Sequence, residues 1–170
     1  EGKLPFPVYS MVGGKWTTFR AFAAQITERT LGLLGRKRLK DTVDLPIGGG
    51  KGYPISVEKR KEWLANLSKK TGLPVERLDT WLERYGTWTE RLAEFSAAGK
   101  DAPLKHTPEY TRREIQYLCL HEKVERLDDL AIRRTSLGMQ GKLTKALVEE
   151  LAEISSEALG WNSSRRKEEI

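Results

Sequence analysis

One segment near the start of the sequence combines residue types that bind anions: Gly13-Gly14-Lys15-Trp16-Thr17-Thr18. Two glycines let the backbone approach a ligand closely, and either threonine can cap a helix that follows them. The free N–H groups of the first helical turn would then face the ligand beside the lysine. The segment therefore predicts a site for an anion or an electron-rich carbonyl group. A plain strand-to-helix turn is the structural alternative, and the absence of GxxxxGK[ST] and GxGxxG leaves the ligand unnamed.

A second group of residues that could do chemistry comes later in the sequence: His121, Glu122, Asp129, Arg133 and Arg134. Asp129 and Arg133 are four residues apart, which places them on one helix face as an ion pair. Catalysis would need a substrate pocket beside His121, and a metal site would need a third ligand at usable spacing, which the sequence does not offer. We therefore interpret all five residues as structural and expect no metal site.

The elements that must position the first segment are a strand and a helix. Residues 6–12 read as a short strand that is apolar on both faces, as in a strand buried within a sheet. From Thr17 the apolar spacing changes to 3.6 residues, which predicts a helix ending near Gly35. No second strand is apparent. In the isolated chain we expect residues 6–12 to be disordered, rearranged or paired with another copy.

The rest of the chain reads as helical. Residues 41–55 are rich in glycine and proline and predict a linker. Beyond the linker, Thr87–Glu90 and Thr111–Glu114 have the spacing of capping boxes, and Gly72 and Gly160 stand where helices end. The sequence predicts a mainly α protein in three parts: a remnant strand and helix of an α/β domain over residues 1–40, the linker, and a bundle of five or six helices over residues 56–170.

The charge composition bears on whether the protein binds nucleic acid. The chain has 170 residues, 32% of them charged, with a net charge of +6. Acidic residues interleave with the basic ones, which favours a solvated mixed surface over a nucleic-acid partner. A helical DNA-binding module remains an alternative, in which two helices within residues 127–142 would carry Arg133 and Arg134. Asp128 and Asp129 would then face phosphates. A protein-interaction bundle is the other alternative.

Cysteine usage and hydropathy point to a cytoplasmic protein. The single cysteine, Cys119, cannot form an intramolecular disulfide, so a reducing compartment is expected. It falls on an apolar helix face and is interpreted as an inert core residue. No stretch reaches the eighteen or so apolar residues of a membrane-spanning helix.

Three stretches of the sequence, in order, carry a family resemblance: VGGKWTTFRAFA, LPIGGG and TPEYTRREIQYLCLHEKVERLDDLAIRRTSLG. They resemble the C-terminal part of FAD-dependent glycerol-3-phosphate dehydrogenases and alpha-glycerophosphate oxidases. The resemblance spans about residues 9–161. It implies that residues 1–40 are the end of an FAD-binding domain and that residues 56–170 are the small helical C-terminal domain.

The resemblance also implies a function for the first segment. Enzymes of this family use FAD to oxidise glycerol 3-phosphate to dihydroxyacetone phosphate and pass electrons to quinone or oxygen. Carried over by residue, the cofactor-binding positions would be Gly13, Gly14, Lys15, Trp16, Thr17 and Thr18, with Lys15 also the active-site lysine.

The resemblance further implies the partners of the chain. These are a missing N-terminal FAD-binding domain, glycerol 3-phosphate, quinone and a second copy of the chain in a homodimer. The full-length enzyme would lie peripherally on the cytoplasmic membrane. Because the upstream FAD-binding segments are missing, the isolated chain is expected to bind no FAD strongly and to have no dehydrogenase activity.

Overall fold

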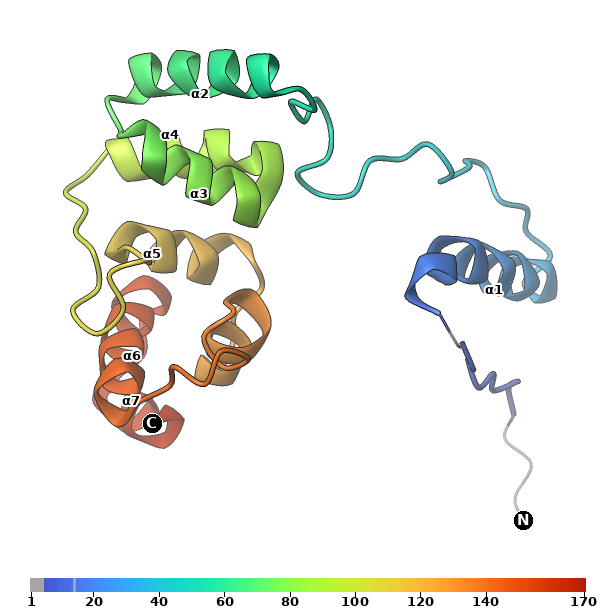
Figure 1. The fold of residues 1–170 in the computed structure, drawn as a ribbon. Coiled ribbons are helices and arrows are strands. Elements are labelled where there is room, and N and C mark those ends of the chain that lie inside the picture. The colour runs from blue at the N-terminus through green and yellow to red at the C-terminus, as the bar shows by residue number, and fades with distance from the viewer. Residues whose placement is uncertain (1–4, 14) are drawn as a thin grey trace. The chain divides into compact units, whose positions relative to one another are not determined.

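The computed structural model describes residues 5–13 and 15–170, and the chain divides into two compact units, Glu1–Ile47 and Gly48–Ile170. The first unit contains a short 3-10 helix, η1 (Trp16–Thr18), followed directly by α1 (Phe19–Leu33) (Figure 1). None of the residues of α1 is buried. Helix α1 ends before Gly35, which has a φ of +65°. The sequence therefore located this helix well.

The remnant strand predicted over residues 6–12 is not formed in this chain, because the described residues of the first unit contain no strand. This agrees with the expectation that the segment does not keep its sheet structure in the isolated chain. All seven of these residues are exposed, including Val8 and Val12, which were expected to point into a sheet. A strand satisfies its backbone N–H and C=O groups through a neighbouring strand. Since none lies beside this segment among the described residues, its β-type sequence does not produce a strand.

The second unit is helical, as predicted. The described residues contain seven α-helices, six of them in this unit. In order, the elements of the unit are α2 (Val57–Thr71), α3 (Val75–Tyr85), the 3-10 helix η2 (Gly86–Trp88), α4 (Thr89–Ala97), α5 (Arg112–His121), the π-helix η3 (Asp129–Arg134), α6 (Lys145–Leu159) and α7 (Ser163–Glu169).

Most helix ends follow the local sequence. The predicted capping box at the start of α5 is confirmed, since the Thr111 side chain accepts from the Glu114 backbone N–H and the Glu114 side chain accepts from the Thr111 N–H. Gly72 and Gly160 end α2 and α6 in the left-handed conformation that favours glycine. These signals fix where the helices begin and end.

The other predicted capping box, Thr87–Glu90, is wrong. Thr87 lies inside η2, and its hydroxyl donates to the carbonyl oxygens of Gly49 (3.2 Å) and Lys51 (2.9 Å). The Thr87 side chain thus binds the end of the linker to the turn between α3 and α4. A tertiary contact replaces the local one that the spacing suggested.

Two glycines bring these two segments into backbone contact. Gly49 has a φ of +79° and Gly86 a φ of +59°. A Cβ added to Gly86 would lie 2.3 Å from the Gly49 carbonyl oxygen, and one added to Gly49 would lie 2.2 Å from the Tyr85 oxygen. The Thr87 N–H donates to the Gly49 oxygen across the same contact. Only glycine fits this geometry at either position.

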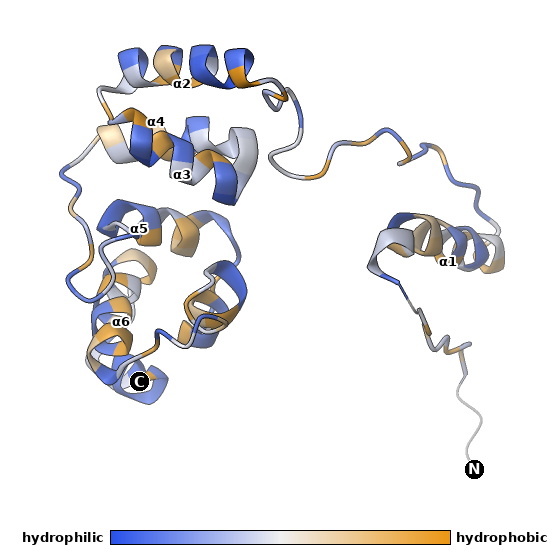
Figure 2. Cartoon of the chain, viewed as in Figure 1, coloured by the Kyte–Doolittle hydropathy of each residue, from blue (hydrophilic) through white to orange (hydrophobic). Residues whose placement is uncertain are grey.

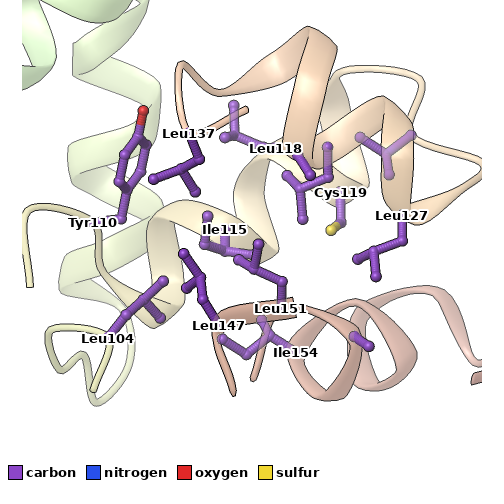
Figure 3. Close-up of a cluster of buried hydrophobic side chains, with 14 residues drawn as sticks. Leu104, Tyr110, Ile115, Leu118, Cys119, Leu127, Leu137, Leu147, Leu151 and Ile154 are labelled. Carbon is purple, nitrogen blue, oxygen red and sulfur yellow. The ribbon is translucent and has the colours of Figure 1, made fainter. Parts of the chain in front are cut away.

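The core of the second unit has two parts. In Figure 1, α2 lies along α3 and α4, while α5 lies beside α6. The first cluster comes mainly from α2, α3 and α4, and its buried members include Leu64, Leu67, Leu78, Trp81, Leu82 and Leu92. The second comes mainly from α5, α6 and the segment between them, and includes Ile115, Leu118, Cys119, Leu147, Leu151 and Ile154, whose side chains converge in Figure 3.

One tyrosine joins the two clusters. Tyr85, at the end of α3, packs against both of them. Figure 2 shows both hydrophobic and hydrophilic residues along α2 and α6, as expected for helices with one buried face. Cys119 is buried in the second cluster, as predicted.

Candidate functional site

The described part of the glycine-lysine-threonine segment forms a turn that leads into α1. Lys15 is extended (φ −143°, ψ 134°) and precedes η1. The Thr18 hydroxyl and backbone N–H both donate to the Lys15 carbonyl oxygen, at 3.0 and 3.3 Å. Neither η1 nor α1 has a side-chain cap, so neither Thr17 nor Thr18 caps the helix as the sequence had suggested. The Thr18 hydroxyl stabilises the turn instead.

This turn is open on the surface of its unit. Residues 15–18 are all exposed, and Trp16 retains 93% of its accessible surface. Gly13 lies close to α1, because a Cβ there would meet the Phe22 ring at 3.5 Å. Gly14 lies outside the described residues. A helix start without a side-chain cap, next to a lysine, offers N–H donors and positive charge to an anionic group.

The five residues interpreted as structural all lie in the helical unit, but in different environments. His121 ends α5, and its ring lies 4.4 Å from the Tyr117 ring and 6.2 Å from the Phe95 ring, centroid to centroid. It therefore packs against aromatic side chains. The predicted ion pair is present, with Arg133 Nη1 2.8 Å from Asp129 Oδ1.

Asp129 also organises the backbone before the π-helix. Its Oδ2 accepts from the N–H groups of Arg126 (3.0 Å) and Glu125 (3.2 Å). These backbone hydrogen bonds, with the nearby positive charge of Arg133, lower the pKa of the Asp129 carboxyl below its usual value. The carboxylate form is thus favoured where the chain enters the π-helix.

An open cleft of about 350 Å³ brings together three of these five residues. Arg134 donates through Nε to the Glu122 carbonyl oxygen at 2.6 Å. The cleft is lined by Gly48, Arg84, Tyr85, Trp88, Leu118, Glu122, Arg133 and Arg134. His121 and Asp129 are not in its wall. The sequence did not predict this cleft, because its walls come from segments up to 86 residues apart.

A buried carboxylate behind the cleft holds Arg84 in place. Glu114 is fully buried, and its Oε1 accepts from Arg84 Nη1 (2.9 Å) and from the Tyr85 hydroxyl (2.7 Å). Burial and the nearby Glu114 charge raise the pKa of the Tyr85 hydroxyl strongly. Burial lowers the pKa of Arg84, but attraction to Glu114 together with Tyr110 outweighs it, so the net shift is upward. The guanidinium stays charged.

Within residues 5–13 and 15–170, no group of three or more His, Cys, Asp or Glu side chains could hold a metal ion. None of the helices in the described part of the chain is long and apolar enough to cross a membrane. The segment that would resemble a helix-turn-helix does not form one, because residues 135–141 form bends and turns and residues 142–144 form no regular element.

Comparison with known proteins identifies relatives of the chain. Residues 40–166 match a family described as the C-terminal domain of alpha-glycerophosphate oxidase. A glycerol-3-phosphate dehydrogenase from Pseudomonas aeruginosa is 31% identical over 133 residues, which are 78% of this chain and 25% of that protein. The aerobic glycerol-3-phosphate dehydrogenase of Escherichia coli is 31% identical over 153 residues, which are 84% of this chain and 29% of that protein.

A more distant relative extends the similarity over nearly the whole chain. A probable mitochondrial glycerol-3-phosphate dehydrogenase from Dictyostelium discoideum is 26% identical over 169 residues, covering 95% of this chain and 25% of that protein. The chain thus spans between a quarter and a third of the length of these three relatives. The resemblance seen in the sequence is confirmed: the chain belongs to the family of C-terminal domains of alpha-glycerophosphate oxidase.

Proposed function

We propose that this chain is the C-terminal part of an FAD-dependent enzyme that oxidises glycerol 3-phosphate to dihydroxyacetone phosphate and passes the electrons to quinone or oxygen. The observation that carries the proposal is the family match over residues 40–166. The names of the relatives support the substrate, and their greater length supports a missing N-terminal FAD-binding domain. Peripheral attachment to the cytoplasmic membrane and a homodimer stay predictions of the resemblance.

Within this enzyme, residues 13–18 are proposed to form one edge of the flavin site. The chemistry of their donors fits an anionic or carbonyl-bearing group, because the helix start has no side-chain cap and Lys15 stands directly before it. When bound, FAD would supply the two-electron oxidation of the substrate. The helix N-terminus would stabilise negative charge by about 0.3–2 kcal/mol, and Lys15 would add a positive charge toward the cofactor or the substrate phosphate.

The helical unit is proposed to be structural in this reaction. Its buried residues are mostly apolar, and its charged residues are largely paired with one another, as with Arg84 and Glu114. The chain alone lacks the rest of the flavin site, so we propose that it is inactive and that purified protein carries no stoichiometric flavin.

The test is Lys15→Ala in the full-length enzyme, with Lys61→Ala on the exposed face of α2 as the matched control. We expect the Lys15 variant to lose turnover or flavin content at least tenfold, because a positive charge is removed beside the cofactor or substrate. The control should match the wild type. Flavin absorbance and quinone-linked glycerol 3-phosphate oxidation measure the two properties.

Unchanged turnover and flavin content in the Lys15 variant would refute the site assignment. The isolated 170-residue chain is the other arm of the experiment. Yellow protein with one flavin per chain would overturn the proposal that the chain lacks most of the cofactor site.

A further inference from the structure

The arginine-lined cleft of the helical unit is not used by the proposed oxidation. We propose that it is a binding site for a small phosphate monoester with a hydroxylated carbon skeleton. The inference rests on the cleft itself and does not depend on the flavin assignment. All of its walls belong to the unit Gly48–Ile170.

The first argument is the supply of N–H donors. Three arginines line the cleft, and each forms its hydrogen bonds and ion pairs through one nitrogen: Nη1 of Arg84, Nη1 of Arg133 and Nε of Arg134. Each has further N–H groups that these contacts do not occupy. Arginine forks match the oxygens of a phosphate group in pairs, which makes converging arginines a phosphate-binding arrangement.

The second argument is charge. Glu114 balances Arg84, and Asp129 with Asp128 balances Arg133. Arg134 is different, because its recorded partner among the described residues is the neutral carbonyl of Glu122. Among the described residues, no carboxylate therefore lies within ion-pair distance of the Arg134 guanidinium, and Glu122 has the one carboxylate in the cleft wall. An anion entering the cleft would supply a negative partner for Arg134.

The third argument is how firmly the arginines are placed. Arg84 also stacks on the Tyr110 ring, with its guanidinium carbon 3.9 Å from the ring centroid. Arg133 and Arg134 end the π-helix, a rare element that occurs frequently at functional sites. Asp129 holds the start of that π-helix through two backbone hydrogen bonds. Donors fixed before binding lose less conformational entropy when a ligand arrives.

The remaining walls suit a carbon skeleton with hydroxyl groups. Trp88 and Leu118 offer apolar surface, and the Glu122 carboxylate can accept from a hydroxyl. The volume of about 350 Å³ is at the lower end of the range for small-molecule sites. Gly48 faces the Trp88 ring, where a Cβ would make only ordinary contact at 3.8 Å. A glycine there keeps the cleft open.

The test is calorimetric titration of the 170-residue chain with glucose 6-phosphate, inorganic phosphate and glucose at physiological salt, which screens non-specific attraction. We expect saturable binding of glucose 6-phosphate, weaker binding of phosphate and none of glucose. Arg134→Gln removes the guanidinium that lacks a carboxylate, and Gly48→Leu fills the cleft while leaving every arginine in place. Each should weaken binding at least tenfold.

The matched control is Arg126→Gln, which removes one exposed arginine outside the cleft wall and should change the affinity less than twofold. Circular dichroism and thermal unfolding show whether each variant folds, and if Arg134→Gln does not, Gly48→Leu decides. Absence of saturable binding, or equal affinity in all four proteins, would overturn the proposal. Equal affinity for phosphate and glucose 6-phosphate would overturn the role of Trp88 and Glu122.

Discussion

The buried Glu114 side chain stabilises two parts of the helical unit at once. It closes the capping box of α5 and also accepts hydrogen bonds from Arg84 and Tyr85 of α3. A carboxylate removed from water is stable only when such partners satisfy it. One residue thus joins a local helix start to a contact thirty residues away in the sequence.

Replacing Glu114 with Gln should destabilise the domain by about 3 kcal/mol. The amide loses the negative charge opposite Arg84, and its NH2 group would face the Thr111 N–H, where the carboxylate now accepts. Glu153→Gln is the control, because Glu153 is half exposed and its pairing with Arg112 is worth less than about 1 kcal/mol. Urea unfolding of the two variants measures the difference. Equal midpoints would contradict the prediction.

A surface pair makes stability depend on pH. Lys142 donates to Glu109 at 2.6 Å, and this hydrogen bond lowers the pKa of the Glu109 carboxyl below its ordinary 4.5. A folded-state pKa below the unfolded value gives stability that is present above the unfolded pKa and is lost as the pH falls through the folded pKa.

Glu109→Gln should therefore lower the free energy of unfolding by about 0.2–1 kcal/mol near neutral pH, discounted because both side chains are about 40% exposed. In acid, below the folded pKa of Glu109, wild type and variant should converge. Urea unfolding across this pH range measures both arms. A constant difference down to the acid end would show that the Lys142 pair is not its source.

At the scale of elements, the backbone contact between the linker and the turn after α3 requires glycine at both Gly49 and Gly86. Gly86→Ala should cost about 3 kcal/mol or more, because the new Cβ would overlap the Gly49 carbonyl in a positive-φ conformation. Gly72→Ala is the matched control: it also has a positive φ, but nothing lies within 4 Å.

The control should cost only the strain of the left-handed conformation, about 1–2 kcal/mol. Thermal or urea unfolding compares the two variants. If they were equally stable, steric closure between Gly49 and Gly86 would not be what fixes the linker end.

The sequence predicted helices better than contacts between them. The Thr111–Glu114 pair marked the start of α5 correctly, because capping depends on residues within one helical turn. Thr87 misled for the opposite reason, since its hydroxyl bonds to a segment 36 to 38 residues earlier. The π-helix carries no recognised sequence signal.

Of the two candidate sites, the sequence likewise predicted only the one whose residues are local. The glycine-lysine-threonine turn was visible because its residues are consecutive. The cleft was not visible, because Arg84 of α3 and Arg133 and Arg134 of the π-helix line one cleft only in the folded unit. Its residues appeared in the sequence as separate charges. The group around His121 was correctly expected to contain an ion pair, but the sequence did not show that three members of the group line a cleft.

At the scale of the whole chain, the two units should differ sharply in stability. Helix α1 has 15 residues, none of them buried, and an isolated helix of that length is marginal in water. Amide hydrogen exchange should therefore be fast throughout α1 and slow in α5 and α6, whose buried residues form the second core cluster.

Exchange mass spectrometry on the 170-residue chain measures both regions at once. Protection of α1 equal to that of α6 would contradict the prediction. A rise of α1 protection with protein concentration would instead indicate that a second copy covers it, in agreement with the homodimer expected from the resemblance.

The position of Cys119 has a practical consequence. It is the sole thiol of the chain and lies on α5 against Ser155 of α6. Only 3% of it is exposed, and burial raises the pKa of the thiol. A thiol-reactive dye can attack it only after those helices separate and the sulfur ionises. The rate at which a dye labels the native protein therefore measures how often α5 and α6 separate, and no engineered cysteine is needed.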